Sequence, residues 1–242
     1  MTCAELSARR DAATTTQSQA SGDRPLAQTL LLASGAVGPL LFIVVFLVEG
    51  ATRPDYSPLR DFVSSLSLGE GGWVQVASFL ICGALVACFA IGLRRALVAG
   101  KGSTWAPILL GVFGLSLVGA GIFPTDPLLG YPPGAPTVTT VHGALHILLS
   151  LFAFASLAAA CFVLSRRFPG DPAWRGWAAY SVVTGILVVA LFVATDVVSL
   201  SPDPTAPAGL VQRVTIVVGW VWVALLALKL LRVGVPPRRG GR

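Results

Sequence analysis

The stretch "VTTVHGALHILLSLFAFASLAAACFVL" (residues 138–164) contains no acidic residue, lysine or arginine. An α-helix of about 20 predominantly apolar residues crosses the roughly 30 Å hydrocarbon core of a lipid bilayer. This run is long enough to do so, and its first turns contain both histidines of the chain, His142 and His146. The stretch therefore predicts a membrane-spanning helix that is polar at its beginning.

Five further segments have the same length and apolar character: residues 28–49, 73–93, 105–124, 177–199 and 209–231. Hydrophobic residues make up 55% of the 242-residue chain, and charged residues make up 12%. An ordinary soluble domain carries about 25% charged residues, which form its solvated surface. We therefore predict an all-α polytopic membrane protein, a bundle of six transmembrane helices over residues 28–232 with the lipid bilayer as its surroundings.

The 17 basic residues are distributed unevenly between the two sets of loops. Arg53, Arg60 and Arg213 fall on one side, and the other fourteen fall on the side of the two chain ends. Because Lys and Arg are enriched in cytoplasmic loops, we expect both termini in the cytoplasm, with residues 1–27 as a disordered tail and 233–242 as a basic tail. The preference for Arg over Lys is typical of a GC-rich bacterial genome, which suggests a bacterial plasma membrane. The net charge of +6 thus reflects orientation and not a nucleic-acid partner.

His142 and His146 are four residues apart, so they lie one turn apart on the same face of the predicted helix. Two imidazoles in this arrangement can bind one Zn²⁺ if a third ligand comes from elsewhere. Asp126 of "FPTDP" is the best further ligand, and Asp61 and Asp196 fall at the same predicted depth. The alternative is a hydrogen-bonded polar plug between helices. Haem is disfavoured, because two histidines on one face of one helix cannot bind opposite faces of a porphyrin.

Two other groups of polar residues fall at the same end of the predicted bundle. In "RDFVSSLSLG" (residues 60–69), Asp61 and Ser64 are candidate helix caps, and they are also candidate catalytic residues if a histidine activates the serine. Asp196 and Arg213 fall near the ends of consecutive spans, where a charge close to hydrocarbon is costly unless it is paired. We expect an ion pair between them, which is also a candidate ligand-binding site.

Four motifs occur in a fixed order among the six spans: "YSPLRDFVSSLSLGEGGWVQVASFLICG" (residues 56–83), "GIFPTDP" (121–127), "TTVHGALH" (139–146) and "GLVQRV" (209–214). With them the chain resembles the bacterial and archaeal domain-of-unknown-function 998 family over residues 28–232. The resemblance implies a six-helix inner-membrane protein and no established activity. It picks out Asp61, Ser64, Asp126, His142, His146 and Arg213 as motif positions. A more distant likeness is to membrane hydrolases of the alkaline-ceramidase superfamily, which use Ser, Asp and His around a metal, although this chain lacks a third histidine.

Three functions remain open on these residues. The leading hypothesis is an integral plasma-membrane protein with an outward-facing polar pocket that binds a lipid head group or a small ligand. The first alternative is a metal-dependent membrane hydrolase acting on lipid, with His142, His146 and an aspartate as zinc ligands. The second alternative is a proton-coupled transporter in which Asp196, Arg213 and the histidines form a relay.

Overall fold

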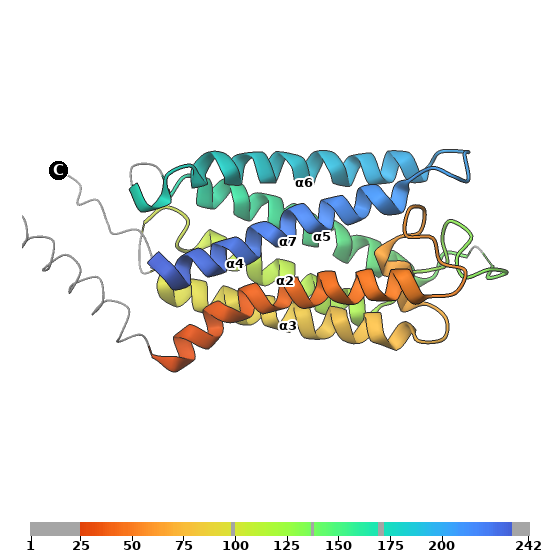
Figure 1. The fold of residues 1–242 in the computed structure, drawn as a ribbon, viewed down its shortest axis with the longest axis horizontal. Coiled ribbons are helices and arrows are strands. Elements are labelled where there is room, and N and C mark those ends of the chain that lie inside the picture. The colour runs from red at the N-terminus through yellow and green to blue at the C-terminus, as the bar shows by residue number, and fades with distance from the viewer. Residues whose placement is uncertain (1–24, 98–99, 137, 169–171, 234–242) are drawn as a thin grey trace, which may run out of the picture.

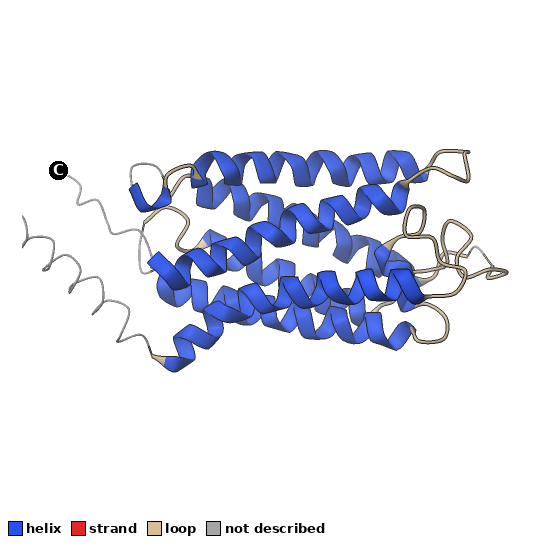
Figure 2. Cartoon of the chain, in the orientation of Figure 1, coloured by secondary structure: helices blue, strands red, loops and turns tan. Residues whose placement is uncertain are grey.

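The computed structural model describes residues 25–97, 100–136, 138–168 and 172–233. Within these ranges the chain contains no strand, as Figure 2 shows. Each of its six long helices is long and apolar enough to cross a membrane, which confirms the predicted all-helical, six-span architecture. These helices are α2 (Leu26–Thr52), α3 (Gly72–Ala96), α4 (Trp105–Ile122), α5 (Val141–Ser165), α6 (Trp177–Ser199) and α7 (Ala208–Val233).

The helix bounds differ from the predicted ones by a few residues. Helix α2 begins two residues before the predicted span and extends past its predicted end, so residues 26 and 27 are helical rather than part of a tail. Helix α5 begins at Val141 instead of residue 138, because Thr140 has an extended backbone and caps the helix with its side chain. The rest of the predicted tails lies outside the described residues, apart from Pro25, which precedes α2, and Val233, which ends α7.

The six helices form a closed ring. Each packs against the next helix along the chain, and α7 packs against α2. The connections α2–α3, α4–α5 and α6–α7 all emerge at one end of the bundle, on the right in Figure 1, which we call the loop-rich end. The beginning of α2 and the end of α7 lie at the opposite end. The polar motifs of the sequence are therefore gathered at one end.

Aromatic side chains fill the middle of the ring. Phe42 of α2 stacks on Trp220 of α7 with ring centroids 4.7 Å apart, and Phe113 of α4 packs edge-on against the same indole at 5.4 Å. Phe79 of α3 lies between Phe42 and the ring of His146 on α5, at 5.4 and 6.0 Å. Pairs of this kind are worth about 0.5–1.5 kcal/mol each beyond the area they bury. They join helices from opposite parts of the sequence.

A short 3₁₀-helix, η1 (Val63–Ser67), lies inside the loop-rich end and contacts α2, α3 and α7. Its first four residues are buried. A second one, η2 (Pro172–Trp174), precedes α6 at the opposite end. Because η1 is tucked between helices, its Ser64 side chain is placed within the bundle instead of in a surface loop.

Candidate functional site

The loop between α2 and η1 is bound to the beginning of α7. The backbone N–H groups of Gly209 and Leu210 donate to the carbonyl oxygens of Arg60 and Leu59, at 3.0 and 2.9 Å. The first N–H groups of a helix have no partner within the helix, so this loop caps α7 with its own backbone. Gly209 permits the close approach, because a Cβ at this position would overlap the carbonyl oxygen of Asp61.

Arg213 fastens the same loop with its guanidinium group. Its Nη1 donates to three backbone carbonyls, those of Pro58 (2.5 Å), Asp61 (2.9 Å) and Gly209 (3.0 Å), and its Nη2 donates to the Tyr56 hydroxyl. Only 8% of Arg213 is exposed, so its charge needs compensation from the protein. The carbonyl dipoles and the Tyr56 ring, 5.4 Å from the guanidinium carbon, provide it. Arg213 therefore acts as a clamp on the 56–62 loop.

The ion pair that we expected between Asp196 and Arg213 is not formed. Ion pairs do form elsewhere at this end of the bundle, between Arg53 and Glu49 and between Arg60 and Asp61. The guanidinium of Arg213 points to the 56–62 loop, where backbone oxygens satisfy it without a carboxylate. A proton relay through Asp196 and Arg213 is consequently not assembled in this arrangement.

Asp61 is fully buried and supports the loop. Its carboxylate accepts the backbone N–H of Ser57 at 2.7 Å and the Nε–H of Arg60 at 2.8 Å. Gln212, which sequence reasoning missed, fixes the start of η1, since its Oε1 accepts the backbone N–H of Val63 at 2.7 Å. The signal available in the sequence was the single amide side chain of Gln212, which stands directly before Arg213 in an otherwise apolar span. Asp61 is thus not placed as a catalytic group.

Asp126 joins the α4–α5 connection to the beginning of α5. Its Oδ2 accepts the backbone N–H of Thr140 at 2.7 Å and its Oδ1 accepts the Thr140 hydroxyl at 2.6 Å. The Thr140 hydroxyl oxygen accepts in turn from the backbone N–H of Gly143 at 3.1 Å. These hydrogen bonds stabilise the charged form and hold the pKa of Asp126 below its usual value. A Cβ on Gly143 would overlap the carboxylate.

His146 is buried, and its Nδ1 lies 2.9 Å from the carbonyl oxygen of Phe123 and 3.2 Å from that of Ala120. Carbonyl oxygens only accept hydrogen bonds, so Nδ1 carries a proton, and in the neutral ring Nε2 is an acceptor. His142 is exposed, and its ring packs edge-on against Phe123 with centroids 5.5 Å apart. The two histidines therefore have different surroundings although they lie one turn apart.

The proposed zinc ligands are not brought together. Across the described ranges, no three His, Cys, Asp or Glu side chains form a group that could hold a metal ion. The physical reason is that each candidate already has another role: His142 packs outward on Phe123, His146 binds the end of α4, and Asp126 caps α5. The side chains that the structure describes therefore do not fit a zinc site, which needs three or more protein ligands at one point.

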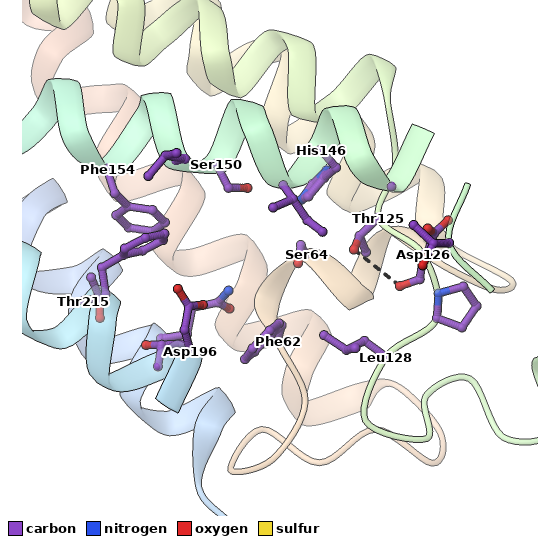
Figure 3. A pocket seen from close by; sticks show the side chains of 18 of the residues that line it. Phe62, Ser64, Thr125, Asp126, Leu128, His146, Ser150, Phe154, Asp196 and Thr215 are labelled. Carbon is purple, nitrogen blue, oxygen red and sulfur yellow. Dashed lines mark hydrogen bonds between the residues drawn. The ribbon is translucent and has the colours of Figure 1, made fainter. Parts of the chain in front are cut away.

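A cavity of about 330 Å³ lies at the loop-rich end (Figure 3). Residues next to the 56–62 loop and residues of the α4–α5 connection both line it. Its walls are mostly apolar, and they include Phe62, Leu128 and Phe154. Its polar side chains come from η1, the α4–α5 connection, α5, α6 and α7: Ser64, Thr125, Asp126, Thr139, His146, Ser150, Thr195, Asp196, Gln212 and Thr215. The cavity thus brings together Ser64, Asp126, His146 and Asp196, whereas Asp61, His142 and Arg213 do not line it.

Several polar groups of the cavity lining have no hydrogen-bond partner in the described chain, among them the Ser64 and Ser150 hydroxyls, Nε2 of His146 and the Asp196 carboxylate. Ser64 and His146 are 9% and 4% exposed. Figure 3 shows Asp196 across the cavity from these two. Ser64 has no hydrogen bond to His146, so it lacks the bound base that activates a serine nucleophile. The arrangement is one that can bind a polar group.

The cavity reaches the outer surface of the bundle along α5. Ile147 and Leu151 line it and are 67% and 50% exposed, as expected for side chains that face lipid. Deeper along α5 the ring of Phe154 packs on Phe192 of α6, with centroids 4.8 Å apart, and closes the space between these helices. Leu128, Val138 and Asp196 also line the cavity and are exposed, so it opens both along the side of α5 and at the loop-rich end.

A search of the curated proteins and a search of the solved structures found no match to this chain. A family model described as "Protein of unknown function (DUF998)" matches residues 36–229. The match includes residues of all six long helices, the 56–62 loop and the α4–α5 connection. The chain therefore belongs to the DUF998 family.

Proposed function

We propose that this protein binds an amphipathic molecule, a lipid or a lipid-like ligand, in the cavity at the loop-rich end. The observation that carries the proposal is the combination of apolar walls that reach the lipid-facing side of α5 with the unpartnered polar atoms of Ser64 and His146 inside. Binding sites for small molecules have this composition, with a few polar groups that orient the ligand among apolar walls.

The dimensions suit a head group and the first part of a chain. The cavity volume of about 330 Å³ is near the lower limit of the roughly 300–1,000 Å³ that is usual for small-molecule sites. The rest of an acyl or alkyl chain would extend past Ile147 and Leu151 into the bilayer. Apolar contact contributes about 25 cal/mol per Å² buried. A buried polar atom that gains a hydrogen-bond partner avoids a penalty of about 1–3 kcal/mol.

We also propose that the loop-rich end faces the outside of a bacterial plasma membrane, with both termini in the cytoplasm. The distribution of basic residues supports this orientation, since fourteen of the 17 fall on the side of the chain ends. The cavity then opens near the outer leaflet. A fusion of green fluorescent protein to the C-terminus should fluoresce in cells, and a dark, exported fusion would contradict the orientation.

The two alternative functions have less support from the geometry. A metal-dependent hydrolase needs a set of ligands, or at least a serine bound to a base, and neither is assembled around Ser64 and His146. A transporter relay needs Arg213 to face the other ionisable groups, but its guanidinium is bound to the 56–62 loop. Ligand binding requires only the cavity as it stands.

The proposal is tested by filling the cavity. Ser150 is half-buried on α5, lines the cavity and has no side-chain hydrogen bond in the described chain, so Ser150→Trp places an indole inside it. Leu148 is 46% exposed on the same helix and does not line the cavity, so Leu148→Trp is the matched control. Octadecanol retention is measured by native mass spectrometry from phosphatidylcholine nanodiscs.

Wild type and Leu148→Trp should retain octadecanol, and Ser150→Trp should retain about tenfold less, equivalent to about 1.4 kcal/mol of lost contact. Thermal unfolding in the same nanodiscs checks that both variants are folded. Equal retention by all three proteins would show that octadecanol binds elsewhere, and absence of retention by wild type would reject the proposal.

A further inference from the structure

We propose that the cavity selects an amphiphile with a primary amine head group, and that Asp196 is the counter-ion of that amine. This inference rests on the proposed binding of an amphiphile and adds the chemical class of its head group. Three independent observations lead to it: the isolation of Asp196, the sign of the charges around the cavity, and the number of hydrogen-bond acceptors inside.

Asp196 lies on α6, less than one turn before the helix ends at Ser199, and its side chain lines the cavity. Its carboxylate has no ion pair and no hydrogen bond within the described chain. The hydroxyl of the adjacent Thr195 donates to the carbonyl of Leu191 at 2.8 Å and is not available to it. A carboxylate close to hydrocarbon is costly unless it is paired. Asp196 is exposed near the end of α6, so a cationic head group can reach its unpaired carboxylate.

The charges around the cavity have one sign. Its charged lining residues are Asp126 and Asp196, and no described lysine or arginine lines it. Arg213 is bound to carbonyls of the 56–62 loop, and Arg60 is bound to Asp61. Asp126 already accepts two hydrogen bonds, which leaves Asp196 as the unsatisfied charge. An anionic head group would meet repulsion here, and a neutral one would gain no ion pair with the carboxylate.

The acceptors match the donors of an ammonium group. A primary ammonium has three N–H donors and no acceptor. The cavity offers the Asp196 carboxylate from α6, Nε2 of His146 from α5 and the Ser64 hydroxyl oxygen from η1. Nε2 is an acceptor because Nδ1 holds the ring proton against the carbonyl of Phe123. These acceptors come from three different elements around one cavity, and a head group with three donors can satisfy more of them than an alcohol, which has one donor.

The test uses three probes with the same chain: octadecylamine, octadecanol and octadecanoate, measured by native mass spectrometry from phosphatidylcholine nanodiscs. The proteins are wild type, Asp196→Asn and the control Asp55→Asn. Asp55 is an exposed residue of the loop-rich end that does not line the cavity, and its positive φ of 57° is one that asparagine readily adopts. Asp55→Asn therefore removes the same charge outside the cavity.

Wild type and Asp55→Asn should retain octadecylamine at least about tenfold more strongly than octadecanol, as expected for a charge-assisted hydrogen bond, and octadecanoate least. In Asp196→Asn the amine preference should fall to less than about threefold, while octadecanol binding persists and shows that the cavity is intact. An unchanged amine preference in Asp196→Asn, loss of octadecanol binding in that variant, or equal retention of the three probes by wild type would overturn this inference. If wild type retains octadecanol and Ser150→Trp does not, the proposed function stands even when the amine preference is absent.

Discussion

Replacement of Arg213 by glutamine should release the 56–62 loop from α7 and lower the free energy of unfolding by about 3–5 kcal/mol. The magnitude follows from the contacts: three backbone carbonyls and the Tyr56 hydroxyl lose a charged donor in a site that is 8% exposed. Each hydrogen bond to a charged group is worth about 1.5–3 kcal/mol, and a glutamine amide or entering water restores part of the total. Thermal unfolding in detergent should show a fall in Tm of roughly 10 °C.

Arg94→Gln is the matched control, because Arg94 is exposed near the end of α3 and the same substitution there should change stability by less than about 0.5 kcal/mol. Limited trypsin digestion gives a second readout, since release of the loop should speed cleavage after Arg60. The reasoning is refuted if Arg213→Gln costs no more than Arg94→Gln, or if cleavage after Arg60 is unchanged.

Burial raises the pKa of Tyr56 to about 12, so the native protein should lose stability between about pH 10, where the unfolded phenol ionises, and pH 12. The tyrosinate absorbance of wild type minus that of Tyr56→Phe measures this titration, and a midpoint near pH 10 would contradict it. Gly143→Ala should cost about 1–3 kcal/mol, because the new methyl group overlaps the Asp126 carboxylate, and it should raise the pKa of Asp126 toward its ordinary value. Gly111→Ala should be neutral or slightly stabilising in a chemical-unfolding assay, because its Cβ would lie 3.9 Å from that of Ala90; equal effects of the two substitutions would count against the role of Gly143.

Hydropathy was sufficient to predict the six helices, because a membrane requires each spanning segment to be long and apolar in the sequence itself. The bounds were less accurate where a local side chain ends the helix. Helix α5 begins at Val141 and not at residue 138, since the Thr140 hydroxyl accepts the backbone N–H of Gly143. Such a cap is a contact between single atoms, and an average over apolar residues does not register it.

The sequence predicted the end of the bundle at which the candidate site lies, but it did not predict the hydrogen-bond partners of the site's side chains. Ser64, Asp126, His146 and Asp196 line one cavity at the end where the sequence places them. The direction of each side chain around its helix, and the backbone atoms that it meets, depend on packing between distant segments. Arg213 shows the consequence, since charge alone suggested a carboxylate partner, whereas the folded chain presents carbonyl oxygens closer at hand. A hydrogen bond from a side chain to the backbone cannot be predicted from residue types, because every residue has a backbone carbonyl.

The capping of α7 by the first loop has a consequence for biosynthesis. The hydrogen bond between Val63 and Gln212 joins residues 149 positions apart, and the neighbouring bonds of Arg213 are equally long-range. These bonds form only after the last helix has entered the bilayer. In a chain that stops after α6, the carbonyl groups of residues 56–62 therefore lack the donors of α7, and the cavity lacks the wall that α7 forms. The ring of helices therefore closes only when α7 has joined α2, and the same step supplies the donors for the 56–62 loop.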